Sequence, residues 1–380
     1  MVAGEASGDL LASHLIAAIR ARLPGAVFSG IGGAHMIAQG FDAWWPAETL
    51  AVRGYVEVLR HYRGIAAIRG QLKQRLLQAP PDLFIGVDAP DFNLDLEVAL
   101  RAAGIRTAHF ISPSIWAWRG ARMDKIRRAV GHMLCVFPFE EKLYRDAGVG
   151  ATYVGHPLAD VIALAPDRDA ARIRLGIAAD APLIALLPGS RVSELRYLAD
   201  RFVRAAGLLH AADPCCRFAV PLAGDATARM WAEAVLRNDA AHVPMTVAPG
   251  GAHAVLAACD VAMVASGTAT LEAALFKRPM VIAYNMAPLS WQMMRRMAYL
   301  PYVGLPNILC GEFVVPELLQ DDASPENLAQ AAGNLMVDAG TRTRIAGRFA
   351  RLHRELRHGM AARAAETIAE QFFPAATADA

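Results

Sequence analysis

The sequence has little that would draw the chain to nucleic acid, anchor it in a membrane or cross-link it by disulfides. Its 38 basic and 36 acidic residues leave a formal net charge of +2, and there is no long basic tail. The five cysteines show no CxxC spacing, which favours reduced residues over a disulfide framework. No apolar run approaches the length of a membrane span, and no signal-peptide pattern opens the chain. We therefore expect a soluble or peripheral protein on the cytoplasmic side.

Two motifs of common nucleotide and metal enzymes are also missing. The chain has no GxxxxGK[ST] phosphate loop and no cluster of His, Cys, Asp or Glu with zinc or magnesium spacing. The glycines at 30–33 lack GxGxxG spacing after a proper strand and are a weak dinucleotide signal. We therefore expect neither a metal nor a cofactor. The composition is globular, 55% hydrophobic and 19% charged, and 380 residues favour two domains.

The stretch that organises the chain runs from Ala185 to Glu194, within an apolar run that begins at Pro182. Its apolar residues predict a buried strand, the residues from Pro188 a tight turn, and those from Ser193 a helix. Amide groups in the first turn of a helix lack intrahelical partners, and the helix dipole adds partial positive charge there. A capped turn with a solvated arginine is the alternative interpretation. We predict a diphosphate site made of Gly189, Ser190 and Arg191.

A second helix that starts with small residues follows the predicted strand 261–265. Because the carboxyl ends of parallel strands meet at one edge of a sheet, Ser266, Gly267 and Thr268 are predicted to face the same nucleotide. Glu272 lies one turn into this helix, within reach of a ribose diol. Its alternative role is that of an acid that stabilises the helix dipole.

The first half opens with a loop of small and acidic residues. We interpret Met1 to Asp9 as a βα turn whose strand is nearly missing, followed by a helix at 10–23. Glu5, Ser7 and Asp9 are predicted to face a ligand crevice at the end of that strand. A simple capping role for Ser7 and Asp9 is the alternative.

Two carboxylates and an amide follow the apolar strand predicted at 82–87. Asp88 ends the strand, Asp91 and Asn93 come next, and a helix is predicted from Leu94. One such residue can cap the helix, but two carboxylates are more than a cap needs. We predict that one of the two aspartates is a general base.

Two tryptophans lie in the loop that follows the predicted strand 106–111. Exposed tryptophan is costly, so Trp116 and Trp118, together with Ser112, are predicted to line a pocket. Packing beneath the loop is the alternative. His156 leaves a later strand and is a candidate acid or base, although a lone histidine is more often structural.

The segment 44–78 mixes apolar, aromatic and cationic residues with only two acids, Glu48 and Glu57. This mixture suits an interface with anionic lipid, and the stretch 291–299 repeats it on a smaller scale. A pair of core helices with a solvated basic face is the alternative. The cations of the longer segment are Arg53, Arg60, Arg63, Arg69, Lys73 and Arg75.

Both halves repeat strand–helix units with polar loops at the strand ends. The predicted architecture is therefore α/β, with two doubly wound Rossmann-like domains facing across a cleft.

Seven motifs in order carry a resemblance to a known family: GEASGD at 4–9, DAPDFN at 88–93, SPSIWAWR at 112–119, GHPLAD at 155–160, LLPGSR at 186–191, SGTATLE at 266–272 and LPN at 305–307.

This set resembles the lipid-A-disaccharide synthases, which are bacterial glycosyltransferases, over essentially the whole chain. The motifs at 88–93 and 112–119 are specific to that family, whereas those at 186–191 and 266–272 are shared by other two-domain sugar-nucleotide enzymes. The sequence departs from the family at its N-terminus, where the family has a complete first strand before GEASGD.

The resemblance implies a GT-B fold. Residues 1–164 would form an acceptor-binding domain completed by C-terminal helices at 342–373, and residues 165–341 a UDP-sugar-binding domain. It also implies a metal-independent, inverting transfer from UDP-2,3-diacylglucosamine to 2,3-diacylglucosamine 1-phosphate. The products would be a β-1,6-linked disaccharide 1-phosphate and UDP.

The resemblance also implies residue roles. Asp91 matches the position that the family gives to the general base, with Asp88 as the close alternative. Arg191 and the neighbouring amides would stabilise the departing UDP, Glu272 would hold the ribose, and Asn307 would complete the UDP site. The residues of the acceptor loops would be Glu5, Ser7, Asp9, Asn93, Ser112, Trp116, Trp118 and His156.

The expected location is the inner face of the inner membrane of a Gram-negative bacterium, reached through residues 44–78, with a homodimer as one option and no nucleic-acid partner. Two other functions fit part of the pattern. A UDP-sugar 2-epimerase of the same fold would have a soluble substrate and no reason for a cationic apolar segment. A catalytically silent UDP-sugar-binding regulator would keep Arg191 and Glu272 but would need no base at Asp91.

Overall fold

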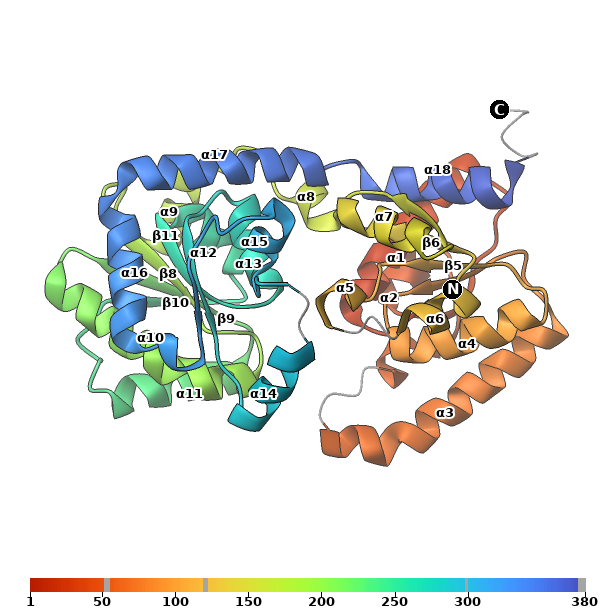
Figure 1. Cartoon of the computed structure of the whole chain (residues 1–380), viewed down its shortest axis with the longest axis horizontal. Helices are drawn as coiled ribbons and strands as arrows, with labels where there is room; N and C mark the ends of the chain where they lie inside the picture. Colours follow the sequence, from red (N-terminus) through yellow and green to blue (C-terminus); the bar gives the residue numbers. More distant parts are fainter. Residues whose placement is uncertain (51–54, 119–121, 298–299, 375–380) are drawn as a thin grey trace. The chain divides into compact units, whose positions relative to one another are not determined.

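The computed structural model describes residues 1–50, 55–118, 122–297 and 300–374, without the side chains at 55–62, 117, 118, 289, 293, 296 and 297. The chain forms two compact units (Figure 1). The first consists of residues 1–160 together with the segment from Leu356 onwards, and the second of residues 161–355. The predicted assignment of acceptor and nucleotide to separate domains stays a prediction.

The first unit contains a seven-stranded sheet in the order β3-β2-β1-β4-β5-β6-β7, whose neighbouring strands all run parallel. The strand order reverses between β1 and β4, which makes their carboxyl ends the topological switch point. The strands are β1 (Val2–Ala3), β2 (Ser29–Gly32), β3 (Asp42–Pro46), β4 (Phe84–Val87), β5 (Thr107–Phe110), β6 (His132–Cys135) and β7 (Gly150–Tyr153).

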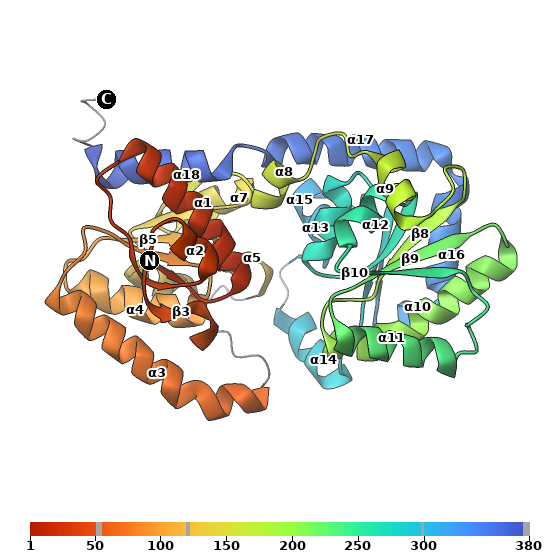
Figure 2. The ribbon, with the colours of Figure 1, turned by 180° about the vertical axis from the view of Figure 1, so that it is seen from behind.

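Helices cover this sheet because their apolar residues recur at helical spacing. In α1, Ala12, Leu15, Ile16 and Ile19 are buried, and α18 lies beside this helix (Figure 2). The helices of the unit are α1 (Ala6–Arg22), α2 (Ala34–Ala38), α3 (Tyr55–Gln78), α4 (Pro90–Ala102), α5 (Ile115–Trp118), α6 (Met123–Ala129), α7 (Pro138–Asp146) and α18 (Met360–Phe372), with a short 3-10 turn at Ala47–Thr49 and α8 (Pro157–Val161) at its boundary.

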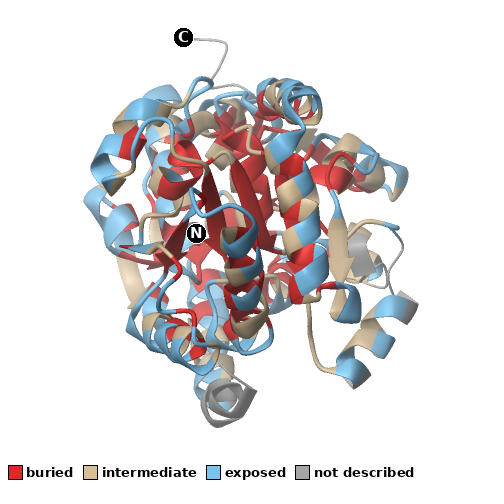
Figure 3. Cartoon of the chain, turned by 90° about the vertical axis from the view of Figure 1, so that its left-hand side faces the viewer, coloured by how far each residue is buried: buried red, intermediate tan, exposed pale blue. Residues whose placement is uncertain are grey.

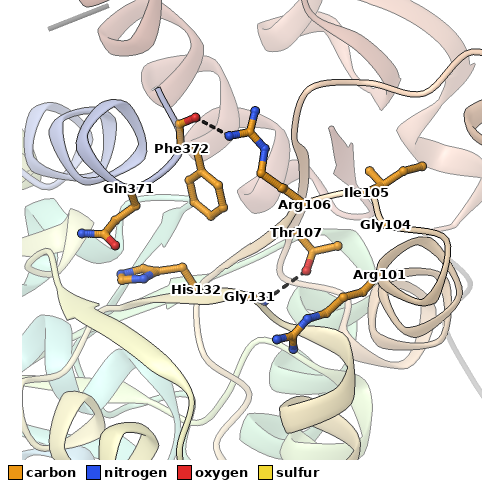
Figure 4. Close-up of a pocket in the computed structure, with 9 residues that line it drawn as sticks. All are labelled: Arg101, Gly104, Ile105, Arg106, Thr107, Gly131, His132, Gln371 and Phe372. Atoms are coloured by element: carbon orange, nitrogen blue, oxygen red, sulfur yellow. Dashed lines mark hydrogen bonds between the residues drawn. The ribbon is translucent and has the colours of Figure 1, made fainter. Parts of the chain in front are cut away.

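The last helix is tied to the amino-terminal end of β5. Arg106 donates to the carbonyl oxygen of Phe372 and, through Nε, to that of Asp82 at 3.0 Å. The ring of His132 meets the ring of Phe372 edge to face (Figure 4), beside a cavity of about 330 Å³. These contacts join the C-terminal helix α18 to the sheet that the N-terminal part of the chain forms.

The second unit has a six-stranded parallel sheet in the order β10-β9-β8-β11-β12-β13, with its switch point between β8 and β11. Strands β8 and β11 are buried along their whole length, as expected for central strands covered on both faces (Figure 3). The strands are β8 (Leu183–Leu187), β9 (Arg217–Leu222), β10 (Met245–Pro249), β11 (Val261–Ala265), β12 (Met280–Tyr284) and β13 (Glu317–Leu319).

Helices again follow the strands of the second unit. They are α9 (Arg168–Leu175), α10 (Val192–Ala212), α11 (Asp225–Arg237), α12 (Ala252–Ala258), α13 (Thr268–Leu275), α14 (Pro288–Met297), α15 (Leu305–Cys310), α16 (Pro325–Val337) and α17 (Ala339–Leu356), with a 3-10 turn at Gln320–Asp322. Among the helices described in either unit, none is long and apolar enough to cross a membrane.

Two local expectations differ from the structure. Helix α4 begins at Pro90 rather than at Leu94, because proline at the first helical position has its φ preset and needs no N–H partner. Asp91 and Asn93 therefore lie in the first turn of the helix. In the segment 44–78, residues 51–54 lie outside the described residues; the rest forms the end of β3, the 3-10 turn at Ala47–Thr49 and one long helix, α3, rather than the pair of helices of the alternative interpretation.

Candidate active site

The first loop predicted from the sequence and the Asp88 loop meet at the switch point of the first sheet. Ala3 of β1 pairs with Val87 of β4, so both chains leave the sheet side by side. A Cβ on Gly4 would lie 3.0 Å from the Cβ of Ala89, so glycine allows this close approach. Two of the predicted side chains, those of Glu5 and Ser7, are exposed at this edge.

Asp9 has a different environment from its two neighbours. Its side chain is buried, and its carboxylate accepts hydrogen bonds from the backbone N–H groups of Gly33, His35 and Met36 at 2.8, 2.9 and 3.1 Å. These groups belong to the first turn of α2, whose dipole also favours a negative charge there. The carboxylate therefore caps a neighbouring helix, and a role in the acceptor loop stays a prediction.

The Asp88 loop has an unusual backbone. Asp88 and Ala89 both adopt left-handed conformations, with φ of 51° and 44°, which are costly for residues other than glycine. The buried Asn93 side chain stabilises this turn, because its Nδ2 donates to the carbonyl oxygen of Asp88 at 2.8 Å. Strain of this kind is found where a side chain must be held in a particular direction.

The two candidate bases differ in their partners. The Asp91 carboxylate is 82% exposed and accepts a hydrogen bond from Nη2 of Arg122 at 2.5 Å. The Asp88 carboxylate has no hydrogen-bond partner among the residues that the structure describes. The Asp91 carboxylate is thus already engaged by Arg122, and which of the two aspartates is the base stays a prediction.

A buried pair behind this loop was missed by the sequence analysis. Nδ1 of His109 lies 2.7 Å from Oε1 of Glu97, and both side chains have no exposed surface. Burial disfavours the imidazolium, but the charges of Glu97 and Asp88 outweigh it and raise the pKa of His109. The signal was available: Glu97 follows Asn93 by one helical turn, and Gly86 leaves room for its carboxylate on β4.

Two side chains of helix α7 hold the loop that follows β5. Ser112 is buried, and its hydroxyl lies 2.7 Å from the Tyr144 hydroxyl. Trp116 donates its indole N–H to Glu140 at 3.0 Å. The Trp118 side chain lies outside the described residues.

His156 is buried against an aromatic ring. Its imidazole stacks on Phe137 with ring centroids 5.3 Å apart, and its Nδ1 accepts from the Leu158 N–H at 3.2 Å. Burial lowers the pKa of His156 to about 4, so the ring is neutral at physiological pH.

In the second unit, the predicted nucleotide residues come together around one cavity. Residues 189–191, residues 266–268 and Glu272 all line a cavity of about 410 Å³ at the carboxyl ends of β8, β9 and β11. This is the switch point of the second sheet, where open α/β sheets bind their ligands. The first-turn amides of α13 lie at its wall. Among the described residues, no group of three or more His, Cys, Asp or Glu side chains could hold a metal ion.

Two acids in this cavity already have partners. The Glu194 carboxylate accepts from the N–H groups of Ser190 and Arg191 at 2.9 and 3.2 Å, a capping role that the sequence analysis missed. Nε2 of His253 lies 3.5 Å from Oε1 of Glu272, and this interaction raises the pKa of His253. The backbone amides of the turn are therefore less available to a ligand than the Arg191 guanidinium.

Asn307 is fully buried and does not line the cavity. Its Oδ1 accepts from the N–H groups of Val314 and Val315, and its Nδ2 donates to Glu317 at 2.8 Å. Glu317 in turn accepts from the N–H groups at 303 and 304, and the Ser266 hydroxyl donates to the carbonyl of residue 303 at 3.3 Å. Asn307 thus supports a loop behind Ser266, and its contact with UDP stays a prediction.

Two doubly wound parallel units, one with helix N-termini and an arginine around a cavity at its switch point, form a GT-B-like architecture. Several solved structures share this fold. The UDP-GlcNAc 2-epimerase of Neisseria meningitidis bound to UDP-GlcNAc matches with a TM-score of 0.59 at 11% identity, over 96% of each chain. CalG4, the calicheamicin glycosyltransferase, matches with a TM-score of 0.56 at 16% identity, over 96% of this chain and 94% of that one. These similarities confirm the GT-B-like fold.

Closer sequence relatives identify the family. The family model described as lipid-A-disaccharide synthetase matches residues 1–372. The lipid-A-disaccharide synthase of Dechloromonas aromatica (strain RCB) is 55% identical over 371 residues, 97% of each chain. That of Aromatoleum aromaticum is 56% identical over 368 residues, 97% of this chain and 94% of the relative.

The chain belongs to the lipid-A-disaccharide synthase family. It is a glycosyltransferase of lipid A biosynthesis that condenses UDP-diacylglucosamine with diacylglucosamine 1-phosphate, as the resemblance implied. The epimerase similarity concerns the fold alone.

Proposed function

We propose that the cavity of the second unit holds the UDP part of the donor, and that this is the site where the leaving group is stabilised. The observation that carries the proposal is the convergence of residues 189–191, 266–268 and Glu272 on one cavity at the switch point. The diphosphate accepts hydrogen bonds from the first-turn amides of α13 and from Arg191, and Glu272 receives the ribose hydroxyls. Arg191 is free to turn toward the ligand, because its side chain is 79% exposed and contacts Glu194 only at 3.4 Å.

The proposed reaction inverts the anomeric carbon in one step. The acceptor hydroxyl attacks in line, the bond to UDP breaks, and a carboxylate of the Asp88 loop takes the hydroxyl proton. We assign this role to Asp88 ahead of Asp91, because Asp91 is paired with Arg122. Charge that develops on the departing UDP is stabilised by Arg191 and by the α13 dipole. Glu5 and Ser7, at the same edge of the first sheet, are proposed to contact the acceptor.

UDP release with and without acceptor tests this assignment. Purified protein with UDP-2,3-diacylglucosamine is expected to release UDP only after 2,3-diacylglucosamine 1-phosphate is added, in equal amounts with the disaccharide product. UDP or free sugar released without acceptor would indicate epimerase-like chemistry. Binding of the donor with no UDP release under either condition would indicate a silent binding protein.

We also propose that the protein works at the inner face of the inner membrane, and α3 is the surface that supports this. Its apolar residues Ile65, Ile68 and Leu72 pack against the core of the first unit, so the described part of the helix offers mainly charge to a membrane. Nη1 of Arg69 is paired with Asp95 at 2.8 Å, and Arg75 stacks over Trp44.

The remaining cations of this segment fall into two groups. Arg63 and Lys73 are exposed and have no partner among the described residues. Arg53 and the Arg60 side chain lie outside the described residues.

The homodimer stays a prediction, which a measurement of the molar mass by light scattering tests.

Reversing the charge of Arg63 and Lys73 together is expected to weaken binding to anionic vesicles. Each cation near such a surface contributes about 1 kcal/mol, so losing both lowers the partition coefficient by roughly thirtyfold or more. Vesicle cosedimentation at low and high salt measures this, and high salt should weaken parental binding because it screens the charges.

The matched control carries Arg174→Glu and Arg229→Glu, two exposed charge reversals in the second unit. If the Arg63→Glu/Lys73→Glu variant and the control sedimented equally, α3 would be an ordinary solvated helix.

A further inference from the structure

A buried carboxylate lies directly beneath the Ser112–Trp118 loop and takes no part in the chemistry described so far. Glu140 is only 1% exposed. Its Oε1 accepts from the Trp116 indole N–H at 3.0 Å, and its Oε2 accepts from the Phe137 N–H at 3.0 Å. Helices α7 and α5 thus meet at one side chain.

This arrangement is more than a helix cap needs. A glutamate at the third position of a helix can accept the N–H before the helix while it stays in solvent. Glu140 is instead buried, and the ring of its donor Trp116 lies perpendicular to the rings of Phe137 and Phe139, with centroids 6.1 and 5.1 Å apart. Burial raises the pKa of Glu140 to about 7, despite the hydrogen bonds that lower it. Keeping the Glu140 carboxylate ionised near neutral pH therefore costs the folded protein some stability.

Other titratable groups packed around Glu140 do not change charge in the same range. Burial raises the pKa values of the Cys135 thiol on β6 and the Tyr144 hydroxyl on α7 well above neutrality, and the charge of Glu140 raises both further. Burial keeps His156 neutral above a pKa of about 4. On the outer face of α7, Glu141 is paired with Arg145 at 2.6 Å.

We propose that Glu140 is a positioning residue for the acceptor, whose ionised carboxylate holds Trp116 and thereby the loop that follows β5. Val87 of β4 pairs with Phe110 of β5, so this loop leaves the sheet beside the Asp88 loop, and its contact with the acceptor rests on the proposed function, which places the acceptor at that edge. When the carboxylate gains a proton, one of its oxygens becomes a donor, so the group no longer accepts from both N–H groups. The loop then loosens, and the acceptor binds more weakly, whereas the nucleotide cavity, built from second-unit residues alone, is not affected.

The first test requires no activity measurement. The indole N–H resonance of Trp116, assigned by its absence in Trp116→Phe, is expected to shift with a midpoint near pH 7 in the parent protein. The shift should vanish in Glu140→Gln and persist in Glu141→Gln, the matched control one residue away on the same helix. A Trp116 resonance that does not move between pH 5.5 and 8.5 would overturn the proposal, whether or not the enzyme is active.

The second test separates acceptor binding from nucleotide binding. The acceptor KM of the parent is expected to fall roughly tenfold from pH 5.5 to 8.5, about the contribution of one charge-assisted hydrogen bond. The KM for the UDP-sugar should not follow this curve. In Glu140→Gln the acceptor KM should stay at the acidic value throughout.

If the indole shifted but the acceptor KM did not, the loop would be positioned for something other than the acceptor. The proposed function would then still stand on UDP release. If no acceptor-dependent UDP were released at all, the proposed function would fail while the indole titration still reported on Glu140.

Stability distinguishes positioning from simple support. Because the pKa in the folded protein lies above the ordinary value, the folded state gains stability below about pH 4.5 that is lost as the pH rises through about 7. Glu140→Gln lacks this pH dependence, so the melting temperature of the parent relative to the variant should fall between pH 5 and pH 8. A difference in melting temperature that is the same at both pH values would make Glu140 a structural cap.

Discussion

Replacement of Asp88 by asparagine is expected to lower turnover by roughly a hundredfold or more and to leave UDP affinity unchanged. This is the usual contribution of a general base, and the amide keeps the shape of the side chain but cannot take a proton. The nucleotide cavity is built from second-unit residues, so the change should not reach it. Initial rates of UDP release and calorimetric titration with UDP measure the two effects.

The turnover of Asp91→Asn should be compared with that of Asp88→Asn. Because Asp91 is paired with Arg122 and largely exposed, we expect its loss to lower turnover by clearly less than that of Asp88. Asp95→Asn, on the exposed face of the same helix, serves as the control for a lost surface carboxylate. Near-parental turnover of Asp88→Asn with an inactive Asp91→Asn would return the role to Asp91, the residue that the sequence motif favoured.

Removal of the Arg191 guanidinium is expected to weaken UDP binding and slow the reaction together. A hydrogen bond to a charged group contributes about 1.5–3 kcal/mol, so Arg191→Ala should raise the UDP dissociation constant by roughly ten- to a hundredfold. Turnover should fall as well, because negative charge on the diphosphate grows as the glycosidic bond breaks. The Arg191 side chain is 79% exposed, so the melting temperature without ligand should change little.

Two further variants sharpen this test. Arg191→Lys keeps the charge but loses the fork that holds two phosphate oxygens, so an intermediate affinity is expected. Arg196→Ala removes an exposed arginine of the same helix and should behave like the parent. An unchanged UDP affinity for Arg191→Ala in calorimetry would show that the phosphate lies elsewhere.

Much of the fold could be predicted because it depends on local patterns. The buried strand β11 was predicted with its observed bounds, because an uninterrupted apolar run between turn residues has few other conformations. The nucleotide residues could also be placed together without coordinates. They follow β8 and β11, and the carboxyl ends of parallel strands share one edge.

Local patterns were less informative about the residue at which a helix begins. The run from Asp88 to Asn93 reads equally well as a loop or as a first helical turn, and Pro90 decided in favour of the helix. Strand β3 (Asp42–Pro46) was not predicted, because this short stretch places two tryptophans side by side instead of alternating apolar and polar residues, and it ends at a proline.

The sequence by itself therefore determined the family, the two sheets and the position of the polar loops at the strand ends, since these follow from residues close together in the chain. Only the tertiary structure decided what each polar side chain does. Asp9 caps α2, Asn307 supports a loop, and Glu140 binds Trp116. Each of these roles depends on a partner brought near by the packing of another element. Burial, which sets the protonation of His156 and Glu140, arises only when those elements close over the side chain.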